Sequence, residues 1–328
     1  MPDRAVIQSI GMAVADRVMT NDEFEAIVDT SDEWIQTRTG IKERRIAEPG
    51  QSSSYFGTRA AREALERAGK NPEEVDMVVC ATVTGDYLFP GTASLIQDAI
   101  GAKHAGAYDL GAACAGFIYA AEAAAGMICS GTISNAVVVG IDTLTHFVDW
   151  KDRSTCVLFG DGGGAVFMER ERDTDRGIVA TVMLSDGSGA RHIKVAQGGS
   201  LNPPNSARGE AACPYIYMAG KEVFRFAVRA MADSCSRVLK KAGLTTDDVD
   251  LFCPHQANLR IITAAADHLG LSMDRVFVNV QKYGNMGAGS IPVALYEAEQ
   301  QGRLKRGDLV MTVGFGAGLV WGANLIRW

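Results

Sequence analysis

Short apolar runs alternate with segments that carry helix-start and helix-stop signals along most of the chain. Residues 75–83 and 135–142 are rich in valine and bounded by turn-forming residues, which is typical of buried β-strands. Residues 52–69 begin with serines and end with a glycine, which predicts a helix capped at both ends. This alternation of strand-like and helix-like segments favours an α/β fold.

The same order of segments occurs twice in the chain. LERAGKNPEEVDMVVC (65–80) resembles LKKAGLTTDDVDLFCP (239–254), with a shift of 174 residues between them. That shift relates three pairs of positions: Asp76 and Asp250, Cys114 and Ala288, and Gly140 and Gly314. We therefore expect two similar halves, 1–174 and 175–328, whose sites face each other beyond the carboxyl ends of their strands.

Two further stretches stand apart from this repeat. Residues 198–214, within a region that has no clear counterpart in the other half, are expected to form a long surface loop. Residues 112–129 are the most membrane-like stretch, but they contain Glu122 and are dominated by alanine. We expect them to form a buried helix and not a membrane span.

Composition and charge exclude several classes of protein. The net charge is −7 and no basic stripe dominates the sequence, which argues against a nucleic-acid-binding protein. The seven cysteines include no CxxC pair and have the spacing of neither a zinc site nor a disulfide framework, so we expect no metal and reduced thiols. The N-terminus runs from charged residues directly into a strand-like segment, which argues against a signal peptide and favours a cytoplasmic protein.

Two glycine-rich stretches resemble cofactor-binding motifs only superficially. GDGGGA (160–165) fits GxGxxA, but it leads into a strand-like segment and not into the helix that a dinucleotide site requires. We expect a tight turn between strands at that place. GFGAGL (314–319) likewise leads into a strand-like segment, and no P-loop is present, so we expect no nucleotide cofactor.

One cysteine has the surroundings of a nucleophile. Cys114 lies among alanines and glycines where a strand-like segment passes into the apolar helical run. The free N–H groups at a helix N-terminus lower the pKa of a nearby thiol, and small neighbours let a substrate approach. Without a partner residue, however, the ordinary interpretation is a buried structural cysteine.

The partners come from the second half. His255 follows a strand-like segment in CPHQAN, and Asn285 lies in a small-residue turn, YGNMGAG, at a related place after a predicted strand. Taken with Cys114, they predict acyl transfer through a thioester, with the histidine and asparagine N–H groups holding a developing enolate oxygen.

The chain resembles the thiolase-like condensing enzymes, and most closely the β-ketoacyl-acyl-carrier-protein synthase III family. The resemblance extends over nearly the whole chain and rests on these motifs: SDEWIQTRTGIKERRI (31–46), AACAGF (112–117), FGDGGGAV (159–166), PHQANLRI (254–261), YGN (283–285) and GFGAGL with WG (314–322). It implies a five-layered αβαβα fold, a homodimer, and no cofactor besides the substrates.

The resemblance also implies a reaction. Cys114 would take an acyl group from acyl-CoA, and His255 and Asn285 would stabilise the enolate formed when malonyl-acyl-carrier protein loses CO2. The carbanion would attack the acyl-cysteine in a decarboxylating Claisen condensation that initiates fatty acid synthesis. The amides of Cys114 and Ala317 would form the oxyanion hole. Phe315 would lie beside the cysteine.

Further residues are assigned by the same matching. The implied CoA site at the entrance consists of Trp34, Arg38 and Arg153. Phe89 would close the acyl pocket of the neighbouring subunit. A basic face for the acidic acyl carrier protein would consist of Arg225, Arg229 and Arg260.

This chain departs from the family pattern at several positions. Asp267 and His268 stand where lysines often extend the basic face, so docking is expected to be weaker or shifted. Substitutions that place acyl-chain specificity in question are Met286, Gly287, Ala317 and Leu319.

Two other functions compete with the leading one. A starter-unit condensing enzyme or acyltransferase of secondary metabolism would use the same three residues, so the sequence leaves it open. A non-catalytic scaffold that has lost its nucleophile is disfavoured, because Cys114, His255 and Asn285 are all intact.

Overall fold

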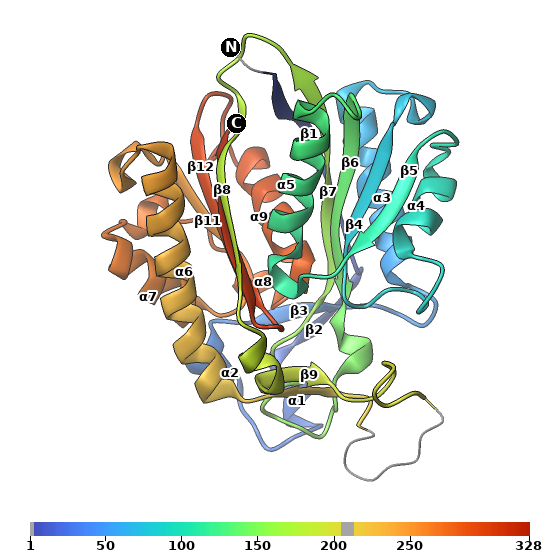
Figure 1. The fold of residues 1–328 in the computed structure, drawn as a ribbon. Helices are drawn as coiled ribbons and strands as arrows, with labels where there is room; N and C mark the ends of the chain where they lie inside the picture. The colour runs from blue at the N-terminus through green and yellow to red at the C-terminus, as the bar shows by residue number, and fades with distance from the viewer. Residues whose placement is uncertain (1–2, 205–212) are drawn as a thin grey trace.

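Layers of helix and sheet alternate across the computed structural model, which describes residues 3–204 and 213–328 (Figure 1). The first sheet has the order β1-β7-β6-β4-β5, and its strands are β1 (Arg4–Val14), β7 (Asp161–Glu171), β6 (Asn135–Thr143), β4 (Met77–Ala81) and β5 (Gly106–Leu110). The second has the order β11-β12-β13-β8, and its strands are β11 (Leu251–Pro254), β12 (Leu309–Gly316), β13 (Val320–Arg327) and β8 (Gly177–Ser185).

Helices cover both sheets. The outer layer on the first sheet consists of α3 (Ser53–Ala68) and α4 (Thr92–Ile100), and that on the second consists of α6 (Gly220–Ala242) and α7 (Leu259–Leu269). Between the sheets lie α5 (Gly116–Cys129) and α9 (Ser290–Gln300). This arrangement confirms the expected five-layered αβαβα fold.

Smaller elements surround these layers. One end of the molecule carries β2 (Arg17–Thr20), α1 (Asn21–Glu25), α2 (Asp32–Thr39) and β3 (Glu43–Ile46). A separate hairpin is formed by β9 (Ile193–Val195) and β10 (Ile216–Met218), and a short helix, α8 (Val280–Tyr283), precedes α9. Residues 198–204 form no regular element, whereas residues 205–212 of the expected loop lie outside the described part of the chain.

The repeat in the sequence corresponds to a repeat in the structure. Asp76 precedes β4 and accepts the N–H of Ser134 beside the start of the neighbouring strand β6. Asp250 precedes β11 and accepts the N–H of Leu309, the first residue of the neighbouring strand β12. Equivalent carboxylates therefore fix equivalent strand pairs, as a repeat within the fold predicts.

The middle layer belongs to both halves. Every residue of β6 is buried, as expected for a strand covered on both faces. The side chains of α5 pack in one cluster with residues of both sheets, including Leu251 and Trp328 of the second half. This packing explains the apolar composition of 112–129 and confirms the buried helix. In the described part of the chain, no helix is long and apolar enough to cross a membrane.

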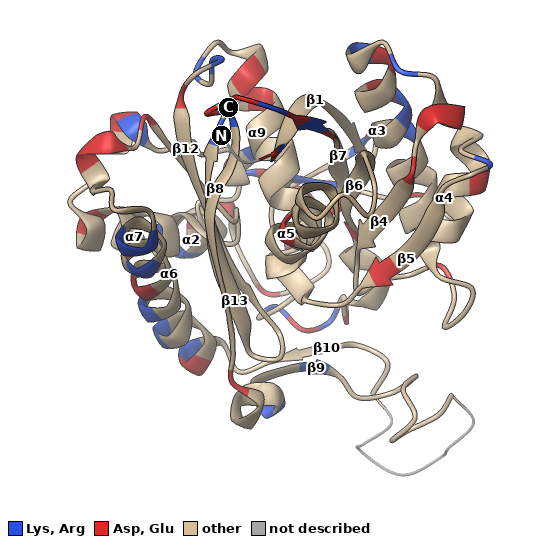
Figure 2. Cartoon of the chain, turned by 45° about the horizontal axis from the view of Figure 1, so that its top comes forward, with Lys and Arg blue, Asp and Glu red and all other residues tan. Residues whose placement is uncertain are grey.

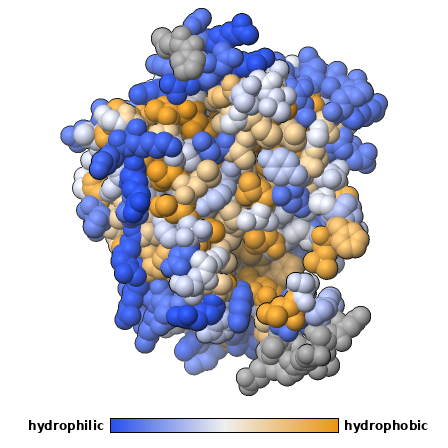
Figure 3. All heavy atoms as spheres, viewed as in Figure 1, coloured by the Kyte–Doolittle hydropathy of each residue, from blue (hydrophilic) through white to orange (hydrophobic). Residues whose placement is uncertain are grey.

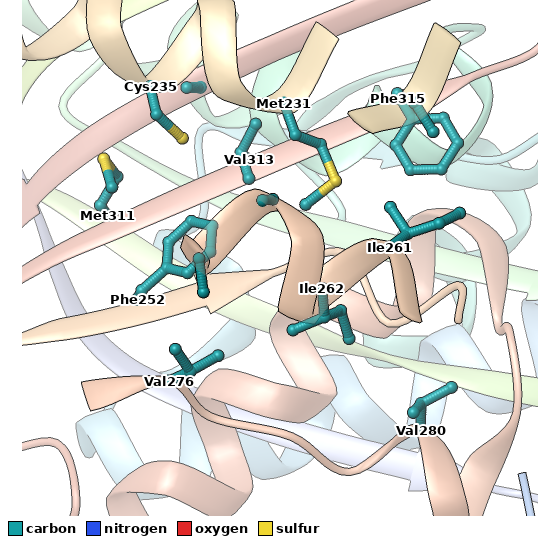
Figure 4. Close-up of a cluster of buried hydrophobic side chains, with 14 of the residues drawn as sticks. Met231, Cys235, Phe252, Ile261, Ile262, Val276, Val280, Met311, Val313 and Phe315 are labelled. Atoms are coloured by element: carbon teal, nitrogen blue, oxygen red, sulfur yellow. The ribbon is translucent and has the colours of Figure 1, made fainter. Parts of the chain in front are cut away.

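A second large cluster fills the space between the second sheet and its outer helices. Met231 and Cys235 of α6 meet Phe252 of β11 and Ile262 of α7 there (Figure 4). Phe315, near the end of β12, belongs to the same cluster. The core of this half thus extends to the edge of the sheet where the candidate site lies.

The prediction of a tight turn at GDGGGA is wrong, because Gly162, Gly163 and Gly164 lie in the first half of β7. A Cβ atom on Gly163 would lie 2.1 Å from the carbonyl oxygen of Gly140 on β6, and one on Gly164 would lie 2.9 Å from the carbonyl oxygen of Gly11 on β1. Glycine is required here for the close approach of neighbouring backbones and not for turning the chain.

Candidate active site

A cavity of about 600 Å³ lies at the carboxyl ends of the central strands. Its wall is predominantly apolar. It includes five residues that the sequence analysis assigned to the reaction or placed beside it: Cys114, His255, Asn285, Phe315 and Ala317. The structure therefore brings together residues separated by up to about 200 positions in the sequence. On the face seen in Figure 3, hydrophobic residues reach the surface over the middle and lower parts, whereas the outer margin of the molecule is mainly hydrophilic.

Cys114 lies in a short 3-10 turn, Ala113–Ala115, that leads directly into α5. The preceding Ala113 has a φ of 44°, an unusual value for a residue with a side chain, and such strain is often found at functional sites. The backbone N–H of Cys114 belongs to the first turn of this helical segment, so it has no hydrogen-bond acceptor inside the helix. A Cβ atom on Gly316 would lie 2.6 Å from the amide nitrogen of Cys114, so only glycine lets β12 approach this residue so closely.

The expected lowering of the thiol pKa is wrong. Burial raises the pKa of the Cys114 thiol well above its usual range, and the carboxylate of Asp142 acts in the same direction. These two effects exceed the lowering by the hydrogen bond from its own backbone N–H. Burial therefore favours the neutral thiol.

His255 follows β11 directly and is almost completely buried. Its backbone N–H donates to the carbonyl oxygen of Val313 on β12, and its ring packs edge-on against Phe315 at a centroid distance of 5.5 Å. Its Nδ1 atom lies 2.5 Å from the Oγ atom of Ser290, the first residue of α9. Burial lowers the pKa of His255 to about 3, so the imidazole is neutral at physiological pH.

Asn285 does not follow a strand, contrary to expectation, but comes after the short helix α8. Its backbone N–H donates to the carbonyl oxygen of Leu158, and its carbonyl oxygen accepts from Gly160. Its side-chain Oδ1 accepts the N–H of Gly287 at 2.9 Å. Because Oδ1 is occupied in this way, the amide presents its Nδ2 hydrogens to the cavity.

Sequence reasoning missed Asp142, which joins the two halves at the site. Its carboxylate accepts from Thr82, Val83 and Thr84 on one side and from the N–H of Ala288 on the other. Burial raises the pKa of Asp142 to about 6. A buried polar residue at the end of the valine-rich run 135–142 was the signal available in the sequence.

The three residues assigned to CoA form one cluster outside the cavity. Trp34 on α2 is partly buried, with the guanidinium carbons of Arg38 and Arg153 at 6.0 and 5.0 Å from its ring centroid. Both arginines are exposed. The side chain of Asn258, on the cavity wall, donates to the carbonyl oxygen of Arg38, which connects the cluster to the cavity.

The two phenylalanines assigned to the acyl pocket differ in position. Phe315 lines the cavity, whereas Phe89 is 85% exposed and is not on its wall. Its neighbours Tyr87 and Leu88 are also exposed, but they do line the cavity. This chain thus carries an exposed hydrophobic segment beside the opening of its own cavity.

The three arginines assigned to carrier-protein docking are exposed on neighbouring outer helices. Arg225 and Arg229 are one turn apart on α6, and Arg260 lies on α7 (Figure 2). The guanidinium of Arg260 lies 5.3 Å from the ring centroid of Phe224, which lines the cavity. Asp267 and His268 are exposed at the other end of α7.

Three of the four departures from the family pattern that were linked to acyl-chain specificity do not line the cavity. Met286 is fully buried among Tyr283 and Val293, and Leu319 packs toward Gly189. Gly287 lies so close to Asp142 that a Cβ atom would be 2.1 Å from its Oδ2 atom. Of the four positions, only Ala317 lines the cavity.

Comparisons with known proteins agree on one family. The family described as 3-oxoacyl-[acyl-carrier-protein (ACP)] synthase III matches residues 108–187, and its C-terminal part matches residues 239–328. A curated relative, β-ketoacyl-[acyl-carrier-protein] synthase III of Symbiobacterium thermophilum, is 50% identical over 322 residues, which cover 98% of this chain and 97% of the relative.

Solved structures give the same result. The crystal structure of 3-oxoacyl-[acyl-carrier-protein] synthase III from Aquifex aeolicus has a TM-score of 0.92 at 47% identity and covers 99% of this chain and 100% of its own. The priming β-ketosynthase of the R1128 polyketide pathway has the same TM-score at 36% identity and covers 99% and 97%. The fold is therefore shared with both proteins.

Proposed function

Because this chain belongs to the 3-oxoacyl-[acyl-carrier-protein] synthase III family, we propose that Cys114, His255 and Asn285 perform its condensation. The chain is an acyltransferase of the condensing type that initiates fatty acid synthesis. It joins an acyl-CoA starter to malonyl-acyl-carrier protein and releases CoA and CO2. The observation that carries the residue assignment is that all three side chains, from both halves, border one apolar cavity.

In the first half-reaction, the Cys114 sulfur attacks the thioester carbonyl of acyl-CoA. The amides of Cys114 and Ala317 donate to the oxygen that becomes negative in the tetrahedral intermediate. The carbon–sulfur bond to CoA then breaks, and the cysteine proton ends on the CoA sulfur. Since the thiol is neutral at the start, its proton is lost as the new bond forms.

In the second half-reaction, malonyl-acyl-carrier protein loses its carboxylate as CO2. The electron pair left behind forms an enolate, whose oxygen accepts from the N–H groups of His255 and Asn285. The enolate carbon attacks the acyl carbonyl, and the bond from that carbonyl to Cys114 breaks. The cysteine then takes up a proton from water. These steps use the two thioester substrates and the protein's own groups, and they require no cofactor.

The surrounding clusters fit the two substrates. Trp34 offers a flat surface for the adenine of CoA, and Arg38 and Arg153 offer cations for its phosphates. The basic residues on α6 and α7 suit an acidic carrier protein. The exposed Phe89 would complete the acyl pocket of a second copy, which makes the functional unit a homodimer. We place the enzyme in the cytoplasm, where both substrates occur.

The test follows each half-reaction by mass spectrometry. Purified protein is incubated with acetyl-CoA or a longer acyl-CoA, and then with malonyl-acyl-carrier protein. Cys114→Ala should abolish the acyl-enzyme, whereas Cys129→Ala, at an exposed cysteine outside the cavity, should leave it unchanged. His255→Ala and Asn285→Ala should still be acylated but should lose decarboxylation. An acyl group retained on another residue in Cys114→Ala would contradict the proposal.

A further inference from the structure

A buried serine hydroxyl contacts the catalytic imidazole on the side away from the cavity. Ser290 is completely buried, and its Oγ atom lies 2.5 Å from Nδ1 of His255. The backbone N–H of Gln256 donates to the same Oγ atom at 3.4 Å. In the described part of the chain, Nδ1 is the only acceptor within hydrogen-bond distance of this hydroxyl.

The direction of the hydrogen bond follows from these contacts. A buried hydroxyl whose hydrogen has no acceptor is costly, so the Ser290 O–H donates to Nδ1 of His255. A neutral imidazole carries one hydrogen, and when Nδ1 accepts, that hydrogen is on Nε2. We propose that Ser290 is a positioning residue that fixes the Nε2–H tautomer of His255 and makes it a donor to the thioester carbonyl of the malonyl substrate.

This inference rests on the function proposed above and explains how the donors of the second half-reaction are oriented. Ser290 selects which nitrogen of His255 carries the hydrogen, and the N–H of Gly287 selects which end of the Asn285 amide faces the cavity. Both selections come from one short segment, residues 287–290. The opposite tautomer would direct a lone pair at the substrate oxygen, which is repulsive toward the enolate.

The experiment combines a spectroscopic measurement with the two half-reactions. Protein labelled with 15N-histidine is examined by long-range 1H–15N correlation, and His255→Asn assigns the signal of His255 among the five histidines. The wild type should show the Nε2–H pattern at His255. Ser290→Ala should show the Nδ1–H form or a mixture, lose about tenfold or more in malonyl decarboxylation, and keep its rate of Cys114 acylation within about twofold.

Ser234→Ala is the matched control. Ser234 is equally buried on α6, and its hydroxyl has no partner in the described residues, so its removal should change neither the tautomer nor either half-reaction. An Nδ1–H pattern in the wild type would overturn the role of Ser290. So would a Ser290→Ala variant that decarboxylates at the wild-type rate or loses both half-reactions equally. If His255→Ala itself keeps full decarboxylation, the proposed function fails instead.

Discussion

At the scale of single residues, burial determines the protonation of the proposed catalytic groups. Cys114 and His255 are both held neutral, because a low-dielectric surrounding disfavours the charged form of either side chain. A neutral imidazole is suited to donating a hydrogen bond, and it does not need to change charge during the cycle. Burial and Asp142 raise the pKa of the Cys114 thiol, contrary to the lowering expected beside a helix N-terminus.

The neutral state of His255 predicts two pH dependences. Its pKa is about 3 in the folded protein and close to 6.5 in the unfolded chain, so only the unfolded chain gains a proton between these values. Stability therefore falls as the pH decreases through this range. From about pH 7 to about pH 5, the wild type should lose about 2 kcal/mol more unfolding free energy than His255→Asn.

Denaturant titrations of both proteins at the two pH values measure this difference. The rate of malonyl decarboxylation should show no inflection near the ordinary pKa of histidine. A change of the His255 15N signals to the doubly protonated pattern near that pKa would mean that the imidazole titrates in the folded enzyme.

Gly316 predicts a second effect at this scale. Gly316→Ala places a methyl group against the amide of Cys114, which is one of the two proposed donors of the oxyanion hole, and displaces it. Acylation measured by rapid quench and mass spectrometry should slow by about 100-fold or more. Gly111→Ala, three residues before the cysteine and facing open space, should have little effect on acylation. Equal losses in the two variants would contradict this explanation.

At the scale of elements, Asp142 connects β6 to the segment that carries Asn285. Asp142 is the penultimate residue of that strand in the first half, and its carboxylate accepts the N–H of Ala288 in the second. The geometry of Asn285 therefore depends on a residue of the other half. No local pattern in the sequence shows such a contact.

Asp142→Asn should lower the stability of the protein and the rate of decarboxylation but not the rate of acylation. The new amide group would direct hydrogens at the Ala288 N–H, which costs about 1–3 kcal/mol of stability. Decarboxylation should fall, whereas acylation should not, because removal of a negative charge lowers the pKa of the nearby thiol. Asp76→Asn changes the carboxylate at the other end of β6 and serves as the control. A drop in decarboxylation in Asp76→Asn of the same size would refute the link.

The elements themselves differ in how far the sequence predicts them. The strands at 77–81 and 135–143 and the helix at 53–68 follow from local periodicity and caps, and they occur as expected. The glycine-rich strand at 161–164 does not follow from local sequence. Its glycines are needed because the backbones of β6 and β1 approach closely, and this contact is set by the tertiary fold. Ser290 and Asp142 were missed for the same reason, since their partners are defined only by the tertiary fold.

At the scale of the whole molecule, one chain supplies Cys114, His255 and Asn285 to one cavity, whereas Phe89 is exposed and does not line it. The three proposed catalytic residues thus all come from one protomer, and in the proposed homodimer each protomer would contribute to its partner only the hydrophobic segment that contains Phe89. Mixed dimers of inactive variants can distinguish these two contributions.

Mixtures refolded together should therefore differ in activity. Cys114→Ala with His255→Ala should remain inactive, because neither protomer has a complete set of catalytic residues. Phe89→Ala with Cys114→Ala should regain condensation relative to Phe89→Ala alone, because a protomer with an intact cavity receives an intact Phe89. Assays of condensation over a range of mixing ratios measure this. Recovery in the first mixture would contradict a site built from one chain.

The shared middle layer has a consequence for the ancestry of the chain. The α5 helix is covered by side chains from both halves, so a protein consisting of a single half would expose its apolar surface to water. If the two halves descend from one duplicated gene, their ancestor required a second identical copy to cover that surface. The layer between the sheets would then be a former subunit interface, made permanent when the two copies were fused.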